Sequence, residues 1–305
     1  MTQYDVLGCG VVAVDDLLLV DAYPPPDVKT RVLHSERQGG GLTATALIAA
    51  ARLGSRCAYA GALGEDDLSQ FSIARFEAEG VDLTHLCARP GAKPGHSVIV
   101  VGREGGTRNI FYSGDGVVAC ASDWPPEDVV RSARVLFVDS AGIEGQVRVA
   151  TIARAAGIPI VADLEGGDAP LLHELMSLVD HLIIPAAFAR ALAGEADAEA
   201  ATRSLLASRK GIVVVTDGAA GAWFGVAATG EAEHQPAFGV DVVDTTGCGD
   251  VFHGAYASAL ARGLSLDERV RFAAAAAAIK ATKPGGQSGI PGRPTVEAFL
   301  RQADQ

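Results

Sequence analysis

Short apolar segments of strand length alternate with segments of helical pattern along most of this chain, and this alternation limits the possible fold more than any other feature. The strand-like segments are almost continuously apolar, as expected for strands buried on both faces of a sheet. They are Tyr4–Val14, Arg56–Leu63, Val135–Asp139, Ile158–Asp163, His181–Ile184 and Gly211–Thr216. The helical segments between them are Leu42–Leu53, Asp66–Glu79, Glu144–Ala156 and Ala198–Ala207. We therefore expect an α/β fold built from βαβ units, with a mostly parallel sheet covered by helices on both faces.

The pattern changes in the last third of the chain. Ala222–Ala227 is typical of a short hairpin, and two helices are predicted after it, one from Asp250 and one over Leu266–Thr282. The sequence contains no internal repeat and no low-complexity linker. With 305 residues it is long enough to bury a full core. We expect a single domain that spans residues 1–305.

Two segments depart from the pattern of a buried parallel sheet. Val28–Arg37 and Gly95–Tyr112 mix charged and apolar residues, which is typical of antiparallel strands with one exposed face. They predict a small β-sheet inserted in the domain, formed by residues from about 15–38 and 95–113.

Charge and cysteine usage narrow the range of partners and compartments. The net charge of −12 disfavours nucleic acid or an anionic membrane as a partner. The five cysteines are widely separated and show no metal-type spacing, which is typical of a reducing compartment. The sequence has no secretory apolar region and no apolar run of about 18 residues. We therefore expect a soluble, cytoplasmic protein.

The stretch Asp244–Tyr256 carries the clearest chemical signal. It places Gly247 and Gly249 on either side of Cys248, immediately before an alanine-rich segment. A glycine turn that opens a helix directs free backbone N–H groups toward an anion. Asp250, in the first turn of that helix, would repel a phosphate that was merely held there. It suits a general base that deprotonates a substrate hydroxyl while the N–H groups stabilise a transferring phosphoryl group. The simpler alternative is a carboxylate that only favours the helix dipole.

This stretch resembles the signature of the PfkB, or ribokinase-like, carbohydrate kinases, which reads roughly Asp-Thr-Thr-Gly-Ala-Gly-Asp-x-Phe. The resemblance implies a ribokinase-like fold and an ATP-dependent phosphotransferase with an alcohol group as acceptor. It further implies Mg²⁺ as a cofactor, Asp250 as the base, and Gly247, Cys248 and Gly249 as the anion hole. The inserted sheet would be a lid over the sugar and would supply the contact of a homodimer. Alanine is usual at the position of Cys248, whose thiol would be reactive if the helix lowered its pKa, although the favoured account is that only its backbone N–H and small side chain contribute.

Carboxylates follow the first strand-like segment. Asp15 and Asp16 would lie at the carboxyl end of a parallel strand, where open α/β sheets bind ligands. The sugar-binding aspartate of the resembled family aligns with Asp15, whereas Asp16 fits a solvated strand end. Asp139, at the end of another predicted strand, is a weaker candidate.

A glycine run separates the first lid segment from the following helix. Gly39-Gly40-Gly41 permits close backbone approach and unusual φ values, and together with Ala49–Gly54 it resembles the family's N-terminal signature. The resemblance implies that Gly40 and Gly41 lie against the sugar and that the run acts as a hinge. Thr45 stands where that signature has a sugar-binding asparagine. A flexible turn is an equally good account of the glycines taken alone.

The segment around Thr216 predicts a strand followed by a tight glycine turn. It resembles the family's nucleotide loop, in which Thr216, Gly218 and Gly221 would approach the phosphates of ATP. Many turns share this pattern, so it carries weight only beside the signature at Asp250.

The resemblance also implies bound cations. Lys280–Pro291 resembles the segment that wraps adenine and helps to hold a monovalent cation such as K⁺, to which Asp244 and Thr246 would supply oxygens. The family often has Asn-x-x-Glu near the phosphates to organise Mg²⁺, but the corresponding residues here are Pro185 and Phe188. Neither side chain can coordinate a metal ion.

The identity of the sugar stays open at this stage. Three stretches resemble the sulfofructose kinase subgroup, namely Gly39–Ala46, His234–Ala255 and Pro284–Pro291. Lys29 matches the lysine on the sulfonate side of that subgroup. The subgroup's asparagine and arginine fall on Phe111 and Ala141, which cannot bind an anion, although Arg31 and Arg108 lie near in sequence. A neutral or phosphorylated ketose or furanose is the main alternative.

Three other function classes were weighed. A nicotinamide-dependent oxidoreductase is disfavoured because Gly8-x-Gly10 lacks a third glycine and Val11–Ala13 continues the strand pattern. A non-catalytic sugar sensor would be expected to lose the aspartate that is intact at Asp250. A nucleoside kinase of the same family would favour aromatic side chains in the lid, and Phe111 and Tyr112 keep that alternative open.

Overall fold

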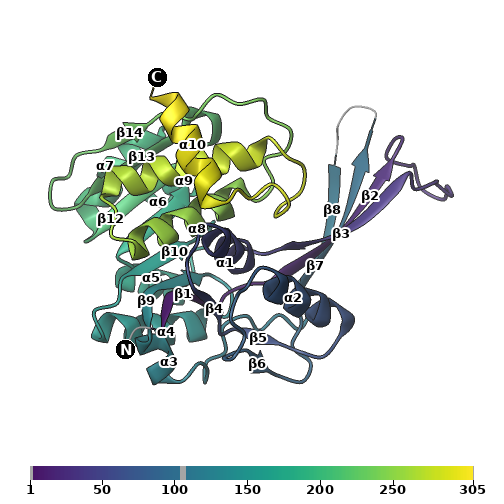
Figure 1. Ribbon diagram of the computed structural model, residues 1–305, viewed down its shortest axis with the longest axis horizontal. Coiled ribbons are helices and arrows are strands. Elements are labelled where there is room, and N and C mark those ends of the chain that lie inside the picture. Colours follow the sequence, from purple (N-terminus) through teal and green to yellow (C-terminus); the bar gives the residue numbers. More distant parts are fainter. Residues whose placement is uncertain (1–2, 104–107, 305) are drawn as a thin grey trace.

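The computed structural model describes residues 3–103 and 108–304, which form a large α/β core and a smaller projecting sheet (Figure 1). The core sheet has eight strands in the order β14-β13-β12-β11-β10-β9-β1-β4. In that order they are Glu233–Gln235, Ala222–Val226, Ile212–Thr216, His181–Pro185, Ile160–Asp163, Ala133–Asp139, Tyr4–Gly8 and Cys57–Tyr59. Strands β12 to β4 are parallel, and β13 and β14 form an antiparallel edge. The predicted mostly parallel sheet is confirmed.

Helices cover both faces of the core sheet, as predicted. Successive side chains of a strand point to opposite faces, so on β9 Val135 and Phe137 join one apolar cluster while Leu136 and Val138 join the other. The first face packs against α1, α2, α8, α9 and α10, at Leu42–Arg52, Asp67–Ala78, Cys248–Ala261, Leu266–Ala281 and Arg293–Ala303. The second packs against α3 to α7, at Glu127–Arg131, Ile143–Ala155, Pro170–Leu178, Ala186–Ala193 and Ala198–Ser208.

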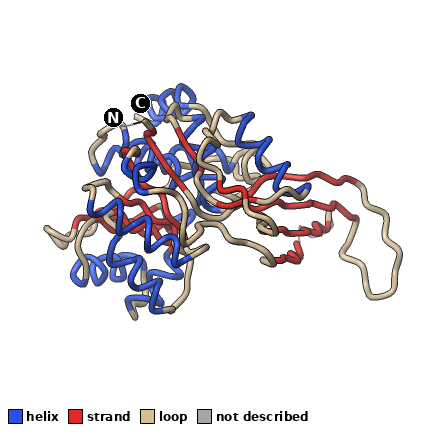
Figure 2. Tube along the Cα trace, turned by 90° about the horizontal axis from the view of Figure 1, so that it is seen from below, coloured by secondary structure: helices blue, strands red, loops and turns tan. Residues whose placement is uncertain are grey.

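The smaller sheet has the order β3-β2-β7-β8 and projects beyond the helices (Figures 1 and 2). Its strands are His34–Gly40, Ala13–Val20, Gly95–Gly102 and Arg108–Ser113. It occupies the two segments predicted to leave the parallel core, although residues 28–33 belong to the loop before β3 rather than to a strand. The predicted antiparallel pairing is correct for β2–β3 and β7–β8, but β2 and β7 are parallel.

Two predicted strands are divided in the structure. Arg56–Leu63 splits into β4 and β5 (Ala62–Leu63), and β5 pairs with β6 (Cys87–Ala88) in a separate two-stranded sheet. Tyr4–Val14 splits between β1 in the core and β2 in the smaller sheet. Apolar continuity alone therefore did not reveal where the chain leaves the core.

The break between β1 and β2 is fixed by a carboxylate at the end of a neighbouring strand. Asp139, the last residue of β9, is fully buried, and its Oδ2 accepts the backbone N–H of Val11 at 2.7 Å. The same oxygen accepts the Thr43 hydroxyl on α1 at 2.7 Å. Asp139 thus holds the connection between the two sheets. Its carboxylate is used within the protein, although the sequence had made it a weaker candidate for the site.

As a consequence, the predicted position of the first carboxylate pair was wrong. Asp15 and Asp16 lie within β2 of the smaller sheet, and neither one ends a strand of the core. The site that includes Asp15 must therefore involve the smaller sheet itself.

The glycine run forms the root of the smaller sheet and is not a free turn. Gly39 and Gly40 are the last two residues of β3, and Gly41 precedes α1 with φ of 93°. A Cβ atom on Gly41 would lie 2.7 Å from both Ala13 N and Val11 O. Glycine is required here by both the left-handed backbone and the close approach of β2.

Within the described ranges, no helix is both long enough and apolar enough to span a membrane.

Candidate active site

The first turn of α8 has the geometry of an anion-binding helix N-terminus. Gly247 caps the helix with φ of 74°, and Asp250 lies in the first turn. The N–H groups of Gly249 and Asp250 donate to no other residue that the structure describes. The Cys248 N–H, in contrast, donates to Thr245 O at 3.1 Å. The predicted anion hole is therefore corrected at Cys248, because its backbone donor is already used within the turn.

The electrostatic surroundings of Asp250 suit a proton acceptor. Its carboxylate is half-buried, and among the described residues it receives no hydrogen bond. Burial, and then the negative charge of Asp163 at the end of β10, raise the pKa of Asp250 well above the ordinary value of 3.8. A carboxylate with a raised pKa and no partner accepts a proton more readily than a surface aspartate.

His253 fixes the turn that carries this carboxylate. Its ring is buried one helical turn after Gly249, and Nδ1 donates to the Gly249 carbonyl at 2.7 Å. Nε2 lies 3.1 Å from the carbonyl of Ile183 on β11, and Nδ1 lies 3.2 Å from Asp163 Oδ2. The ring therefore ties the start of α8, including the turn that contains Asp250, to β10 and β11.

The Cys248 thiol is not activated. Burial raises its pKa, although the nearby charge of Lys280 opposes the shift. The sulfur donates to the Ala277 carbonyl at 3.6 Å. The raised pKa does not favour the alternative of a reactive cysteine, because burial disfavours the thiolate.

Asp15 faces the root of the smaller sheet. Its cross-strand neighbours are Gln38 on β3 and Ser97 on β7, so the three side chains share one face. Burial raises the pKa of the Asp15 carboxyl, while the Ser97 side chain opposes the shift. A Cβ atom on Gly40 would lie 2.8 Å from Asp15 Oδ2, so glycine leaves room for this carboxylate.

The neighbouring carboxylate has a different role. Asp16 points to the opposite face of the sheet, where Arg37 Nε and Nη2 donate to its two oxygens at 2.7 and 2.8 Å. His96 Nε2 lies 2.9 Å from Asp16 Oδ2. The Arg37 guanidinium first, and His96 as well, lower the pKa of Asp16 to about 2. Asp16 is thus a paired structural residue rather than a solvated strand end.

Contacts between distant segments join the two halves of the site. Gln38 Oε1 accepts the N–H of Gly286 at 3.3 Å, and a Cβ atom on Gly247 would lie 2.7 Å from Gly286 O. Arg108 on β8 reaches the same turn, where its Nη1 donates to Thr246 Oγ1 at 3.3 Å. The face of the smaller sheet that carries the Asp15 carboxylate therefore meets the glycine turn that carries the Asp250 carboxylate.

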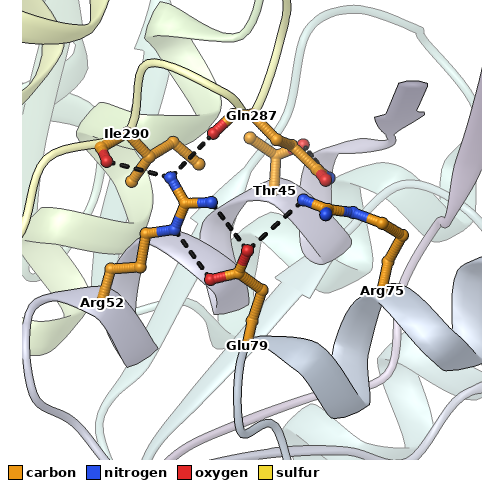
Figure 3. Close-up of polar contacts among 6 residues, drawn as sticks. All are labelled: Thr45, Arg52, Arg75, Glu79, Gln287 and Ile290. Carbon is orange, nitrogen blue, oxygen red and sulfur yellow. Dashed lines mark hydrogen bonds and ion pairs between the residues drawn. The ribbon is translucent and has the colours of Figure 1, made fainter. Parts of the chain in front are cut away.

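A polar network holds the loop after α9 against α1 and α2 (Figure 3). Arg52 Nε and Nη2 donate to the two carboxylate oxygens of Glu79 at 2.7 Å each. Its Nη1 donates to the carbonyls of Gln287 and Ile290 at 3.0 Å each. Arg75 adds a longer contact to Glu79 at 3.3 Å. One guanidinium thus fixes the loop that also supplies Gly286 to the site.

Thr45 is buried beside this polar network and does not lie on an open surface. It is 1% exposed, and its hydroxyl accepts the Gln287 amide at 3.2 Å (Figure 3). A Cβ atom on Gly39 would lie 2.6 Å from Gln287 Oε1. The Thr45 hydroxyl can still donate its own proton, but the side chain is buried, so a sugar could reach it only through this packed region.

The structure separates Lys29 from the other predicted site residues. Lys29 is exposed in the loop between β2 and β3, which extends furthest from the helices (Figure 2). Phe111 lies on the same face of the sheet as Asp16, opposite to Asp15, and the Ala141 N–H is bound by Asp139. The three positions carried over from the sulfofructose kinases do not come together within this chain.

The predicted nucleotide loop lies at the sheet edge that the parallel strands share. Thr216 ends β12, and a 3₁₀ turn over Gly218–Ala220 follows. Gly218 has φ of 52° and is open to its surroundings, whereas Gly221, with φ of 98°, packs against Gln235 O. The open glycine thus leaves backbone exposed at the carboxyl ends of the strands, where α/β sheets bind ligands.

Two features bear on divalent metal binding. Pro185 ends β11 and Phe188 is buried in α6, so the positions of the missing Asn-x-x-Glu carry no ligand atoms in their side chains. No group of three or more His, Cys, Asp or Glu residues within the described ranges could hold a metal ion. The side chains therefore do not fit a dedicated Mg²⁺ cage, and an Mg²⁺ ion would be held mainly by nucleotide phosphates and water.

Asp244 and Thr246, predicted to hold a monovalent cation, lie together before α8. Asp244 Oδ1 accepts the N–H of Thr246 at 2.9 Å, and Oδ2 accepts the N–H of Gly285 at 2.8 Å. Burial alone would raise the pKa of Asp244, but these donors and the charge of Lys280 lower it.

Several site residues were not identified from the sequence. Asp163 ends a predicted strand as Asp139 does, and that position is the sequence signal by which it could be identified. Gln38 and Ser97 became apparent only from the register of the smaller sheet. Lys280 was noted only as the start of a segment, and its burial could not be inferred from an alanine-rich helix.

Comparisons with known proteins agree with this geometry. Residues 10–293 match the model of the pfkB family carbohydrate kinases. A ribokinase from Haemophilus influenzae is 31% identical over 308 residues, which cover 96% of this chain and 97% of that protein. The solved ribokinase of Thermotoga maritima has a TM-score of 0.84 at 27% identity and covers 98% of this chain and 100% of its own. Arabidopsis thaliana ribokinase, solved with ribose and ATP, has a TM-score of 0.86 at 25% identity over 98% and 99% of the two chains.

Proposed function

Because the chain belongs to the pfkB family of carbohydrate kinases, we propose that it transfers the γ-phosphate of ATP to a hydroxyl group of a monosaccharide, with Asp250 as the general base. The observation that carries this proposal is the Asp250 carboxylate, which has a raised pKa and lies beside the free N–H groups of the α8 N-terminus. A base and an anion-binding turn at one point are what phosphoryl transfer to an alcohol requires.

The reaction follows from this arrangement. The substrate hydroxyl loses its proton to the Asp250 carboxylate while its oxygen forms a bond to the γ-phosphorus. The bond from that phosphorus to the bridging oxygen of ATP breaks, and ADP leaves with the electron pair. The N–H groups of Gly249 and Asp250 and the dipole of α8 stabilise the negative charge on the transferring group. His253 keeps this turn in place against the core sheet.

The smaller sheet contains the residues that we propose bind the sugar. Asp15 accepts sugar hydroxyls, and Gly40 gives its carboxylate the necessary space. The sheet acts as a lid, which excludes water because water would compete with the sugar for the phosphoryl group. The hydrogen bond from Arg108 to Thr246 joins the lid to the core.

The proposed substrate is a neutral or phosphorylated ketose or furanose. The sulfonate-binding set of the sulfofructose kinases is not carried over, because Lys29 is distant along the lid and Phe111 occupies the opposite face. Arg108 lies on the face of Asp15, since it pairs in register with Val101 on β7, which pairs with Leu19 on β2. A phosphate on the sugar would find its positive charge there.

On the nucleotide side, ATP occupies the sheet edge beside Gly218, with Thr216 and Gly221 shaping the turn. A Mg²⁺ ion would be held mainly by the nucleotide phosphates and water, and it would neutralise part of the phosphate charge. The Arabidopsis thaliana ribokinase that this chain resembles was solved in complex with ribose and ATP.

We also propose that two chains pair through their lids. β8 is an edge strand, and it exposes Ile110, Phe111 and Tyr112 by 51, 55 and 84%. An exposed apolar edge of this kind favours association with a second copy. Sedimentation velocity should give a dimer for the wild-type protein and a monomer for Phe111→Asp. A wild-type monomer at micromolar concentration would contradict the proposal.

A nucleoside kinase is the second candidate, and one observation favours it. Tyr112 pairs in register with Ser97, which pairs with Asp15, so the Tyr112 ring lies on the sugar face of the lid. Two strand spacings place it about 10 Å from Asp15, a distance suitable for stacking on a base attached to a ribose. Tyr112→Ala should then weaken the binding of nucleosides much more than the binding of free sugars.

The deciding experiment measures ADP release on a panel of sugars, sugar phosphates and nucleosides. A phosphorylated product from one of these classes is expected. Asp250→Asn should keep the fold and ATP binding but lower kcat by about 10²–10⁴-fold. Asp267→Asn is the matched control, because Asp267 is an exposed carboxylate in the first turn of α9. Turnover above a tenth of wild type in Asp250→Asn would refute the assignment of the base.

A further inference from the structure

Lys280 is a charged side chain that is buried without direct contact to any carboxylate of the described residues. It is 0% exposed and lies in the last turn of α9. Its Nζ donates to the main-chain carbonyl of Asp244 at 2.9 Å. An ammonium ion removed from water is costly unless nearby groups compensate its charge. Here the Asp244 carboxylate and the negative end of the α9 dipole provide that compensation.

The atoms expected to hold a monovalent cation already have other partners. Both carboxylate oxygens of Asp244 accept backbone N–H groups, from Thr246 and Gly285. The hydroxyl oxygen of Thr246 accepts the Arg108 guanidinium at 3.3 Å. A K⁺ ion would have to share these oxygens with the N–H donors already bound to them. It would also lie near the Lys280 ammonium, which repels a second positive charge.

The ammonium itself contacts the turn that begins at Asp244. It holds the carbonyl of Asp244, whose carboxylate holds Thr246 on one side and Gly285 on the other. The turn that begins at Asp244 leads directly into the anion-binding N-terminus of α8 at Gly247. The positive charge therefore orients the glycine turn and adds to the field that favours an anion there.

We propose that the Lys280 ammonium is the built-in monovalent cation of this site, so that catalysis needs no K⁺. Lys280 is a positioning residue, since it acts through Asp244 and the turn and not on the reacting atoms. The proposal rests on the proposed kinase function for its activity readout, but its stability readout is independent of that function.

The first test uses the wild-type protein in KCl and in tetramethylammonium chloride at equal ionic strength. We expect kcat to differ by less than twofold between the two salts, and the melting temperature to be unchanged. A several-fold activation by K⁺, or a melting temperature raised by K⁺ alone, would overturn the proposal. The melting measurement reports cation binding even if no sugar in the panel is phosphorylated. A failure of the proposed function can thus be distinguished from a failure of this inference.

The second test replaces the cation. Lys280→Met keeps a long apolar side chain in the packed helix and removes the charge. In tetramethylammonium chloride its kcat should fall at least tenfold, and K⁺ or NH₄⁺ should restore it several-fold, a rescue that a purely structural lysine would not show. Lys210→Met, at an exposed lysine before β12, is the control and should behave as wild type in every salt. Full activity of Lys280→Met without K⁺, or a loss that no cation restores, would refute the proposal. If the variant does not fold, the wild-type comparison still decides.

Discussion

Replacing Arg52 by methionine should destabilise the protein through the loop after α9. The side chain of Arg52 is 24% exposed and that of Glu79 is 13% exposed. Their two hydrogen bonds of 2.7 Å and the two bonds of 3.0 Å to the carbonyls of Gln287 and Ile290 would all be lost (Figure 3). Methionine preserves most of the apolar contact of the arginine stem.

The expected loss of unfolding free energy in Arg52→Met lies between two limits. Exposed ion pairs contribute about 0–1 kcal/mol, and breaking a fully buried pair costs about 3–5 kcal/mol. Both side chains are mostly but not fully buried, and Arg75 remains beside Glu79 at 3.3 Å. We therefore expect the free energy of unfolding to fall by about 2–3 kcal/mol. Urea unfolding followed by circular dichroism measures this change.

Arg75→Met is the matched control, because the Arg75 side chain is 35% exposed and makes one longer contact with Glu79. It should cost less than about 1 kcal/mol. Arg52, through its hydrogen bonds and then its charge, lowers the pKa of Glu79 below 4.5. The stabilisation is therefore complete above pH 4.5 and is lost as the pH falls through the lowered pKa. Equal losses in the two variants, or a loss at Arg52 that does not shrink in acid, would refute this account of the network.

Three further outcomes are expected. First, kcat/KM should decrease in acid with an apparent pKa above 3.8, because Asp250 must be deprotonated to act and burial and Asp163 raise its pKa. Asp163→Asn should move this acid limb to lower pH, and an unchanged profile would contradict the coupling. Second, Asp15→Ala should raise the sugar KM by at least tenfold with little change in the KM for ATP, because charge-assisted hydrogen bonds contribute about 1.5–3 kcal/mol each; equal effects on both substrates would indicate a wrong placement. Third, Gly40→Val should also raise the sugar KM, since a Cβ atom there would lie 2.8 Å from Asp15 Oδ2. Wild-type sugar affinity in this variant would show that the Asp15 carboxylate is positioned elsewhere.

The features that depend on short sequence distances were predictable. The glycine turn and the carboxylate of Asp250 are separated by only three residues, so their relation is set by the local geometry of a helix start. The helix α1 and its C-terminal Gly54, with φ of 94°, follow from the same local rules. Apolar runs flanked by helices likewise predicted a mostly parallel sheet, since a strand buried on both faces must be apolar throughout.

The partners of the site residues were not predictable, because they come from distant parts of the chain. Val11 leaves the core because it donates to Asp139, 128 residues later, and this contact moves Asp15 from the core sheet to the smaller one. The sequence did not indicate a partner for the Thr45 hydroxyl. In the structure this hydroxyl accepts the side-chain amide of Gln287, which is 242 positions away along the chain.

The sequence by itself determined the fold class and the chemistry at the start of α8, because both depend on periodicity and on turns of a few residues. Only the tertiary structure decided which face of the smaller sheet meets that turn. It also decided that the Lys280 ammonium is buried beside Asp244. The physical reason is that burial, strand register and charge pairing are properties of segments brought together by folding, and a one-dimensional pattern does not specify which distant segments meet.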